Sequence, residues 1–162
     1  MFVGCCETDA GCRIRNRFGV GVVDTISSKR RSENMRRIKS KGTKPEMVVR
    51  RLVHSMGLRF RLHAPELPGK PDIVFPRLRK IIEVKGCFWH RHNGCIDSRI
   101  PKSRIEYWRP KLRGNVRRDK RNLLKLQKLG WRVLVLWECE VLRTNPQQLK
   151  KELRSFFGRK SV

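Results

Sequence analysis

Hydrophobic and polar positions first repeat with helical spacing between Thr43 and Gly57. Thr43 and Glu46 match a capping box with Pro45 in the first turn, and Gly57 is a typical residue just beyond a helix end. Apolar side chains between them recur at the spacing of one helix face, at positions 47, 48, 52, 53 and 56. The pattern predicts one amphipathic helix.

Strand-like segments follow this helix. We expect strands over 58–62, 72–75 and 80–85, because each is a short apolar segment bounded by turn residues. A short basic turn separates the last two, which predicts a β-hairpin. Residues two apart in a strand share a face, so Glu83 and Lys85 are expected to point the same way.

The C-terminal half of the chain predicts two more helices and one strand. An apolar stripe predicts a helix over about Pro110–Leu129, with Gly130 as its end. The run Arg132–Trp137 is almost wholly apolar, as expected for a central strand covered on both faces. A last amphipathic helix, Pro146–Phe157, would cover the sheet.

Charge is the strongest compositional signal. The 162 residues include 40 Lys and Arg but only 14 Asp and Glu, which gives a net charge of +26. Cations spread from Arg13 to Lys160 are typical of a protein that neutralises nucleic-acid phosphates. A transmembrane protein is not expected, since no run of about 18 apolar residues occurs. Charge alone also allows a non-catalytic basic binder.

We interpret the chain as a leader followed by one domain. Residues 1–23 lack periodicity and predict a poorly ordered leader, and we hypothesise a natural start near Val22 or Val23. Residues 24–162 would form one domain that opens with a basic segment, 28–42. From this segment we expect DNA-backbone contacts by Arg36, Arg37, Lys39 and Lys41.

Asp72, Glu83 and Lys85 form a candidate catalytic cluster. Pro-Asp followed about ten residues later by Glu-x-Lys is a nuclease signature, and the three side chains would lie on adjacent strands. Carboxylates suit Mg²⁺, which keeps waters for phosphodiester hydrolysis, and a lysine can stabilise charge on the phosphate. The alternative is a turn aspartate beside an exposed ion pair.

A loop rich in cysteine and histidine comes next. Cys87, His92 and Cys95 would supply three of the four donors of a structural zinc site, with Cys139 or His90 as the fourth. A histidine left over near the acidic cluster would be available for proton transfer. The chain has six cysteines and no visible signal peptide, which favours a reducing cytosol and metal ligation over disulfides.

The aromatic residues Phe88, Trp89 and Trp108 lie among polar and basic residues. They allow two interpretations, namely core packing or wedges that enter base steps of DNA. Asn115 and Asp119 are four residues apart on the predicted helix and therefore share one polar face.

Several separated motifs, in order, resemble the very short patch repair (Vsr) mismatch endonucleases from about Asp24 to Arg143. The segments that carry this resemblance are Arg31–Arg36, Ser40–Thr43, Leu67–Asp72, Gly86–His90 and Trp131–Cys139. The resemblance implies a restriction-endonuclease-like α/β fold, with a mixed central sheet flanked by helices and a structural zinc site. It also implies nicking of double-stranded DNA beside a T·G mismatch that arises where 5-methylcytosine has deaminated.

The resemblance assigns roles in catalysis. Asp72 matches the Mg²⁺-binding aspartate, with the main-chain carbonyl of Val84 beside it, and we add Glu83 as a further Mg²⁺ ligand. His90 matches the catalytic histidine and Glu46 a supporting acid. Polar residues around that histidine are matched by Asn115 and Asp119.

The resemblance also assigns the zinc ligands and the DNA wedges. The zinc ligands are matched by Cys87, His92, Cys95 and Cys139, and the wedges by Phe88, Trp89 and Trp108. The chain departs from the best-known members at Glu83 and Lys85, which leaves open whether Lys85 or His90 transfers the proton. It also has an extra residue in the zinc loop before Cys95.

We expect a cytoplasmic, nucleoid-associated bacterial enzyme that acts as a monomer. Possible partners are mismatch-repair proteins, and the resemblance implies a cytosine methyltransferase as genomic companion. Two other functions stay open: a sequence-specific restriction-type nuclease of the same fold, which would cut both strands of a matched site, and a non-catalytic zinc-containing DNA-binding module.

Overall fold

The computed structural model describes residues 27–37, 39, 41–102 and 104–158. The predicted leader, residues 1–23, lies outside this range. No helix in the described part of the chain is both long enough and apolar enough to span a membrane.

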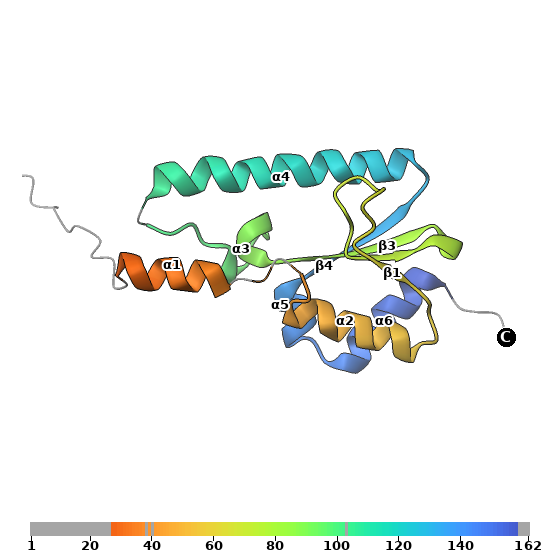
Figure 1. Cartoon of the computed structure of the whole chain (residues 1–162). Coiled ribbons are helices and arrows are strands. Elements are labelled where there is room, and N and C mark those ends of the chain that lie inside the picture. Colours follow the sequence, from red (N-terminus) through yellow and green to blue (C-terminus); the bar gives the residue numbers. More distant parts are fainter. Residues whose placement is uncertain (1–26, 38, 40, 103, 159–162) are drawn as a thin grey trace, which may run out of the picture.

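A four-stranded mixed sheet forms the centre of the molecule (Figure 1). The strands β1 (Arg61–Leu62), β2 (Ile73–Phe75), β3 (Lys80–Lys85) and β4 (Arg132–Trp137) lie side by side in that order. The first three pair antiparallel, whereas β4 runs parallel to β3. The predicted hairpin is therefore confirmed, and so is the mixed α/β class.

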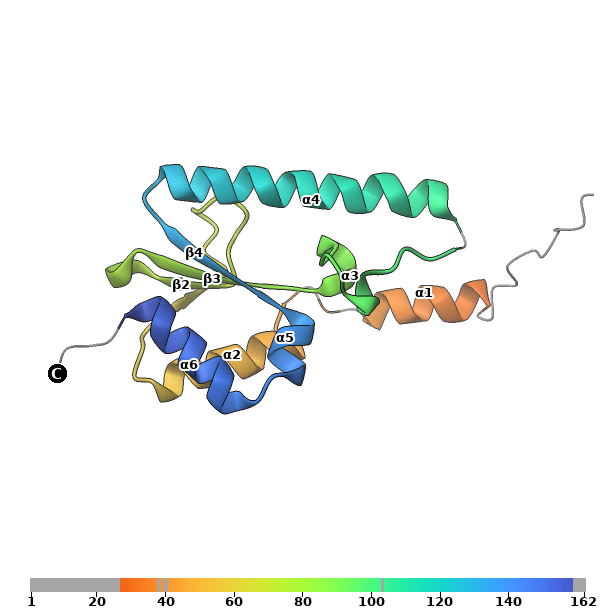
Figure 2. The same ribbon diagram turned by 180° about the vertical axis from the view of Figure 1, so that it is seen from behind.

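Six α-helices are described in chain order around this sheet. They are α1 (Ser28–Arg37), α2 (Lys44–Ser55), α3 (Cys87–His90), α4 (Ile105–Lys128), α5 (Glu138–Arg143) and α6 (Pro146–Phe157). Of two short 3-10 helices, Pro76–Leu78 lies between β2 and β3, and Ile96–Ser98 lies between α3 and α4. Helix α4 covers one face of the sheet, and α2, α5 and α6 lie on the other (Figures 1 and 2).

Strand alternation divides the core between these two faces. On β3, Ile82 packs with α2 and α6 in the larger apolar cluster, whereas Ile81 packs with Leu126 of α4 in the smaller one. The same alternation on β2 directs Ile73 and Phe75 toward α6. Leu149 and Leu153 are buried in the larger cluster, so α6 covers the sheet as predicted.

The predicted strand 58–62 is mostly wrong, because only Arg61 and Leu62 pair in the sheet. Their partners are Val74 and Ile73 of β2. Strand β2 ends at Phe75, since Pro76 opens a 3-10 turn and lacks the N–H that a ladder needs. In this register Phe60 would face Phe75, the last residue of β2, so residues before 60 have no strand to pair with.

The predicted capping box does not form at the start of α2. The Thr43 hydroxyl donates to Glu46 Oε1 at 3.0 Å instead of accepting a backbone N–H. Glu46 Oε2 accepts instead from the Gly42 N–H at 3.0 Å and from Arg50 at 2.9 Å, and the bond to Arg50 is strengthened by charge. The predicted helix end is confirmed, because Gly57 has φ +74°.

The boundaries of α4 and the place of β4 also differ from prediction. Helix α4 begins at Ile105, so Pro110 lies inside it. The proline removes one backbone hydrogen bond, while the extra turn buries Trp108. Strand β4 is an edge strand of the described sheet, paired only with β3. Its apolar run is explained by packing on both faces, with Leu134 and Leu136 on one and Val133 on the other.

Candidate active site and metal centre

A cleft of about 510 Å³ gathers the predicted acidic, lysine and histidine residues. It lies at the C-terminal end of β3, between α4 and the N-terminus of α2. Its lining includes Glu46, Asp72, Glu83, Lys85, His90 and Asp119. These six come from five separate segments of the chain, so only the folded structure creates the cluster.

Strand alternation explains why Glu83 and Lys85 enter this cleft. Both side chains share the face of β3 that carries Ile81, and this face looks toward α4. The Lys85 ammonium lies 3.1 Å from Glu83 and 3.7 Å from Asp119 of α4. The expectation that Glu83 and Lys85 share a face is confirmed.

His90 and Asp119 form a tight pair across the cleft. His90 Nδ1 lies 2.5 Å from Asp119 Oδ2. Burial alone would raise the pKa of Asp119, but the hydrogen bond from His90 and the charges of His90, Lys85 and Arg118 hold that pKa below its usual value. Asp119 is therefore ionised and accepts a hydrogen bond from His90 Nδ1–H, so Nε2 is the ring nitrogen not engaged by Asp119.

Asp72 is a mostly buried carboxylate whose neighbours carry more negative than positive charge. Its Oδ2 accepts a 2.9 Å hydrogen bond from the Val84 N–H. Burial is the main cause that raises the pKa of Asp72 to about 6, and the charges of Glu46 and Glu83 raise it further, against the Val84 bond and Arg50. Acids arranged in this way fit a divalent cation, which would compensate their mutual repulsion.

The Val84 carbonyl is placed on the same side as Asp72. The two polar groups of one strand residue point to the same side of the strand, and the Val84 N–H points at Asp72. The backbone geometry of β3 therefore allows the Val84 carbonyl and Asp72 to bind one metal ion, as predicted.

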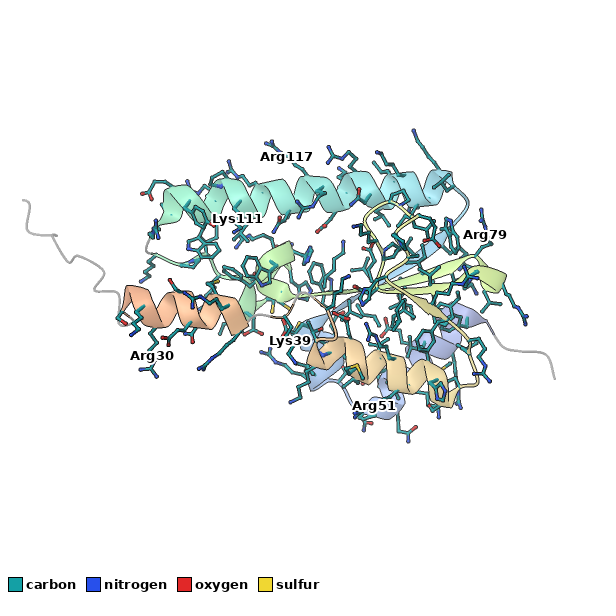
Figure 3. All side chains as sticks on the ribbon, in the orientation of Figure 1. Arg30, Lys39, Arg51, Arg79, Lys111 and Arg117 are labelled. Carbon is teal, nitrogen blue, oxygen red and sulfur yellow. The ribbon has the colours of Figure 1, made fainter. Side chains whose placement is uncertain are left out.

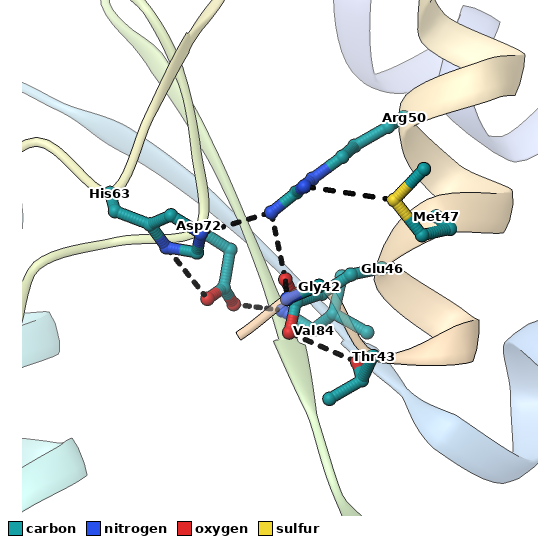
Figure 4. A network of polar contacts seen from close by, with 8 residues as sticks. All are labelled: Gly42, Thr43, Glu46, Met47, Arg50, His63, Asp72 and Val84. Atoms are coloured by element: carbon teal, nitrogen blue, oxygen red, sulfur yellow. Dashed lines mark hydrogen bonds and ion pairs between the residues drawn. The ribbon is translucent and has the colours of Figure 1, made fainter. Parts of the chain in front are cut away.

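Glu46 is held by a network that the sequence did not reveal (Figure 4). The side chain is only 3% exposed. Arg50 Nη2 donates to Glu46 at 2.9 Å and lies 3.0 Å from His63 Nε2. The i,i+4 spacing of Glu46 and Arg50 was a usable signal. No sequence pattern indicates His63, which reaches the network from a left-handed backbone position with φ +49°.

The network fixes the protonation state of His63. Arginine only donates, so His63 Nε2 must accept and the proton resides on Nδ1. Burial, followed by the charge of Arg50, lowers the pKa of His63, which agrees with a neutral ring. His63 Nδ1 then faces Asp72 Oδ1 at 3.8 Å, so Arg50 connects Glu46 to Asp72 through His63.

The predicted zinc ligands come together next to this cleft. One donor atom each from Cys87, His92, Cys95 and Cys139 lies within 4.8 Å of the others. His92 Nδ1 is 3.3 Å from the Cys139 sulfur and 3.7 Å from the Cys87 sulfur. Tetrahedral zinc bonds would separate such donors by about 3.5–3.8 Å, so the set fits zinc. His90 bonds Asp119 instead and is not in the cluster.

The surroundings of the cluster suit a closed structural site. Trp137 stacks on the His92 ring at 4.2 Å between centroids, with planes 6° apart. Burial raises the pKa of the Cys87 thiol to about 12 and raises that of Cys139 as well. The thiols therefore hold their protons unless a cation replaces them.

The aromatic residues form one cluster between α3 and α4. Phe88 lies 5.1 Å from Trp89 and 5.2 Å from Trp108 between ring centroids, and Tyr107 joins at 5.1 Å from Trp108. Trp108 is buried, whereas Phe88 and Trp89 are half-buried. Asn115 faces the cluster rather than the cleft lining, and its side-chain amide donates to the Trp89 carbonyl at 3.1 Å.

The predicted DNA-contacting cations lie at the end of α1 and just after it. All four residues are exposed, namely Arg36, Arg37, Lys39 and Lys41. Of these, Lys39 lines the cleft. Helix α1 lies beside α3 in both views (Figures 1 and 2).

The chain has clear relatives among known proteins. A family model described as DNA mismatch endonuclease Vsr matches residues 23–96. The chain is 51% identical over 120 residues to the Type II nicking enzyme V.XorIIP of Xanthomonas oryzae pv. oryzae, covering 74% of this chain and 88% of that protein. It is 42% identical over 118 residues to the DNA mismatch endonuclease Vsr of Escherichia coli K12, covering 73% and 75%.

These similarities define the class of the protein as an endodeoxyribonuclease. The chain belongs to the Vsr family of DNA mismatch endonucleases. A further relative, the Type II nicking enzyme V.NmeAIP of Neisseria meningitidis, is 39% identical over 120 residues, covering 74% of this chain and 85% of that protein. The resemblance read from the sequence motifs is thereby confirmed.

Proposed function

We propose that this enzyme nicks one strand of double-stranded DNA beside a T·G mismatch produced by deamination of 5-methylcytosine, in a Mg²⁺-dependent hydrolysis. The observation that carries the proposal is the single cleft in which Asp72, Glu83, Lys85, His90 and Asp119 converge. The relative from Escherichia coli bears the name DNA mismatch endonuclease, which supports the mismatch as substrate.

Mg²⁺ would be held by Asp72, Glu83 and the Val84 carbonyl, and when bound it would supply positive charge to the scissile phosphate. The local excess of carboxylates around Asp72 supports this assignment. Glu46, held by Gly42, Thr43 and Arg50, adds negative charge to the proposed Mg²⁺ site from the α2 side.

His90 takes the proton and Lys85 stabilises charge in this proposal. His90 Nε2 accepts a proton from the attacking water while Asp119 stabilises the imidazolium that forms. The water oxygen forms the new bond to phosphorus, the bond from phosphorus to the leaving sugar oxygen breaks, and that oxygen takes a proton from solvent water. Lys85, paired with Glu83 and Asp119 at 3.1 and 3.7 Å, remains an ammonium and stabilises negative charge on the phosphate.

Substrate recognition is assigned to the aromatic cluster and to the cations near α1. Phe88 and Trp89 would enter the distorted base step, with Trp108 as their packed support. Arg36, Arg37, Lys39 and Lys41 would contact phosphates. Zinc held by Cys87, His92, Cys95 and Cys139 would keep α3 and its aromatic residues in place.

The test is a nicking assay on two duplexes that differ only in a T·G or a C·G pair, with and without Mg²⁺. We expect nicking of the T·G duplex alone, abolished by Asp72→Ala and reduced about 10²–10⁴-fold by His90→Ala. Glu152→Ala, which removes an exposed acid on α6, serves as the control and keeps full activity.

Equal cleavage of both duplexes would contradict the mismatch specificity. Cleavage of both strands at a matched site would favour a restriction-type nuclease instead. Full activity of Asp72→Ala would remove the proposed metal site, and binding of DNA without any cleavage would favour a DNA-binding module.

A further inference from the structure

Helix α4 presents its catalytic side chain on one face only. At about 100° per residue, Leu112, Asp119 and Leu126 share the face that meets the sheet and the cleft. Leu112 and Leu126 are fully buried there, and Asp119 bonds His90. This inner face is wholly accounted for by the core and the cleft.

The opposite face of α4 carries a dense group of cations that we call the outer basic face. Arg117, Arg121 and Lys128 point about 160–180° away from Asp119. They line a shallow depression of about 430 Å³ together with Lys120, Leu124 and Lys125. Arg117 projects away from the sheet, whereas Lys111 points toward α3 (Figure 3).

No acidic side chain balances the outer basic face within the described residues. Asp119 is the only acid between 107 and 128, and it points the other way. None of the ion pairs found among described residues involves a cation of this face. Like charges at i,i+4, such as Arg117 with Arg121, destabilise a helix by a few tenths of a kcal/mol per pair. A bound polyanion would relieve that repulsion.

The phosphates of a duplex in the catalytic cleft cannot reach the cations of the outer basic face. A helix with its side chains is about 10–12 Å across, so α4 itself separates the outer basic face from a phosphate backbone beside Asp119. Arg117 and Arg121 therefore lie on the side of α4 that faces away from the cleft-bound duplex. They must meet a different stretch of polyanion or none.

We propose that the outer basic face binds the phosphate backbone of a second stretch of duplex DNA, apart from the duplex in the cleft. From Arg117 to Lys128 the face extends about 16 Å, along which a duplex presents roughly ten phosphate charges. The inference rests on the proposed function, because it takes the cleft to be where the cleaved duplex lies.

The test compares Arg117→Gln/Arg121→Gln/Lys128→Gln with a control of equal charge change, Arg51→Gln/Lys151→Gln/Arg154→Gln, which alters exposed residues of α2 and α6. Protein without Mg²⁺ is first loaded with a labelled 14-base-pair T·G duplex. Capture of a second, matched duplex with another label is then measured by fluorescence cross-correlation over a salt series. Circular dichroism verifies that both variants are folded.

We expect the wild type and the control to capture the second duplex and the α4 variant to lose capture at least tenfold. The log–log salt slope of second-duplex binding should become shallower by up to about 2.7, since each lost phosphate contact contributes about 0.9. Nicking of the 14-base-pair duplex should be equal in all three proteins, which separates this proposal from the proposed function.

Equal second-duplex capture by the α4 variant and the control would overturn the proposal. So would the absence of capture by the wild type. Loss of polyglutamate binding in the α4 variant, with duplex capture unchanged, would assign the face to an acidic protein partner and overturn it as well.

Discussion

At the scale of single residues, the cleft brings carboxylates close together, and the positive charges beside Asp72 do not offset the negative ones. Asp72 shows the consequence, because burial and two acidic neighbours raise its pKa to about 6 from an ordinary value of 3.8. A carboxyl whose pKa is higher in the folded state favours folding when protonated. The stability that it contributes is full below about pH 4 and is lost as the pH rises through about 6.

We therefore predict that Asp72→Asn stabilises the Mg²⁺-free protein at pH 8 and not at pH 4. The upper limit of the gain is about 3 kcal/mol, from a shift of about two pKa units. Urea unfolding with zinc retained, from pH 4 to 8, measures the difference between variant and wild type. Glu152→Gln is the control. A difference that stays constant over this range would contradict the assignment of Asp72 as the strained group.

Arg50 is predicted to position the metal-binding acids. It donates to Glu46 and fixes the tautomer of His63, which faces Asp72. Arg50→Met would release both, and loss of a side chain that orients metal ligands lowers metal affinity about 10–100-fold. We expect the Mg²⁺ concentration for half-maximal nicking to rise about tenfold, while DNA affinity stays unchanged.

A Mg²⁺ titration of nicking measures the effect of Arg50→Met. Arg51→Met changes the next, exposed residue of the same helix and is the matched control. Arg50→Lys should recover part of the loss, because an ammonium can still donate to Glu46. An unchanged Mg²⁺ requirement in Arg50→Met would refute the positioning role.

At the scale of elements, Lys80 ties the hairpin to α6. Its ammonium donates to the carbonyls of Phe156 and Phe157, both at 2.9 Å, and the side chain is only 9% exposed. Both carbonyls lie at the C-terminus of α6, where a helix leaves its acceptors unsatisfied. A positive charge there is also favoured by the helix dipole.

Lys80→Met is predicted to cost about 2 kcal/mol of unfolding free energy, since hydrogen bonds to charged groups contribute about 1.5–3 kcal/mol. Urea unfolding gives the loss, and faster hydrogen exchange at the end of α6 locates it. The comparison variant is Arg77→Met in the exposed hairpin turn. Wild-type stability together with wild-type exchange would show that the contact is not stabilising.

Elements whose patterns are local were predictable, whereas those that depend on a distant partner were not. Helix α2 and the β2–β3 hairpin follow from apolar periodicity and from Gly57 and the basic turn. The length of β1 could not be foreseen, because the early end of β2 at Phe75 sets it. Helix α5 has too few residues for a periodic pattern.

The same distinction applies to the site. Glu83 and Lys85 share a face by strand alternation alone, and the spacing of the Cys/His loop indicated Cys87, His92 and Cys95. Choosing Cys139 over His90 from the residues alone was not possible, because that choice depends on Asp119 reaching His90 from α4. The network of Arg50 and His63 depends on a left-handed residue in a loop.

At the scale of the whole molecule, the cysteine and histidine cluster joins the two ends of the β3–β4 connection. Cys87 begins α3 directly after β3, and Cys139 lies in α5 directly after β4. Between them the chain passes through the loop and all of α4. Zinc would link the two ends of this long connection. It would thereby hold α3, which carries Phe88, Trp89 and His90, against the sheet.

Removal of zinc is therefore predicted to destabilise the fold and to stop nicking together. A loss of a few kcal/mol corresponds to a Tm lowered by roughly 10 °C in a domain of this size. Cys139→Ser should behave like chelator-treated protein, and zinc, but not Mg²⁺, should restore Tm and activity to the chelated wild type. His54→Ala, an exposed histidine on α2, is the control.

Zinc content by elemental analysis should be one per chain and should fall in Cys139→Ser. If Cys139→Ser keeps both the wild-type Tm and full nicking, the cluster is not a structural zinc site, because a lost ligand must weaken a clamp on which α3 depends.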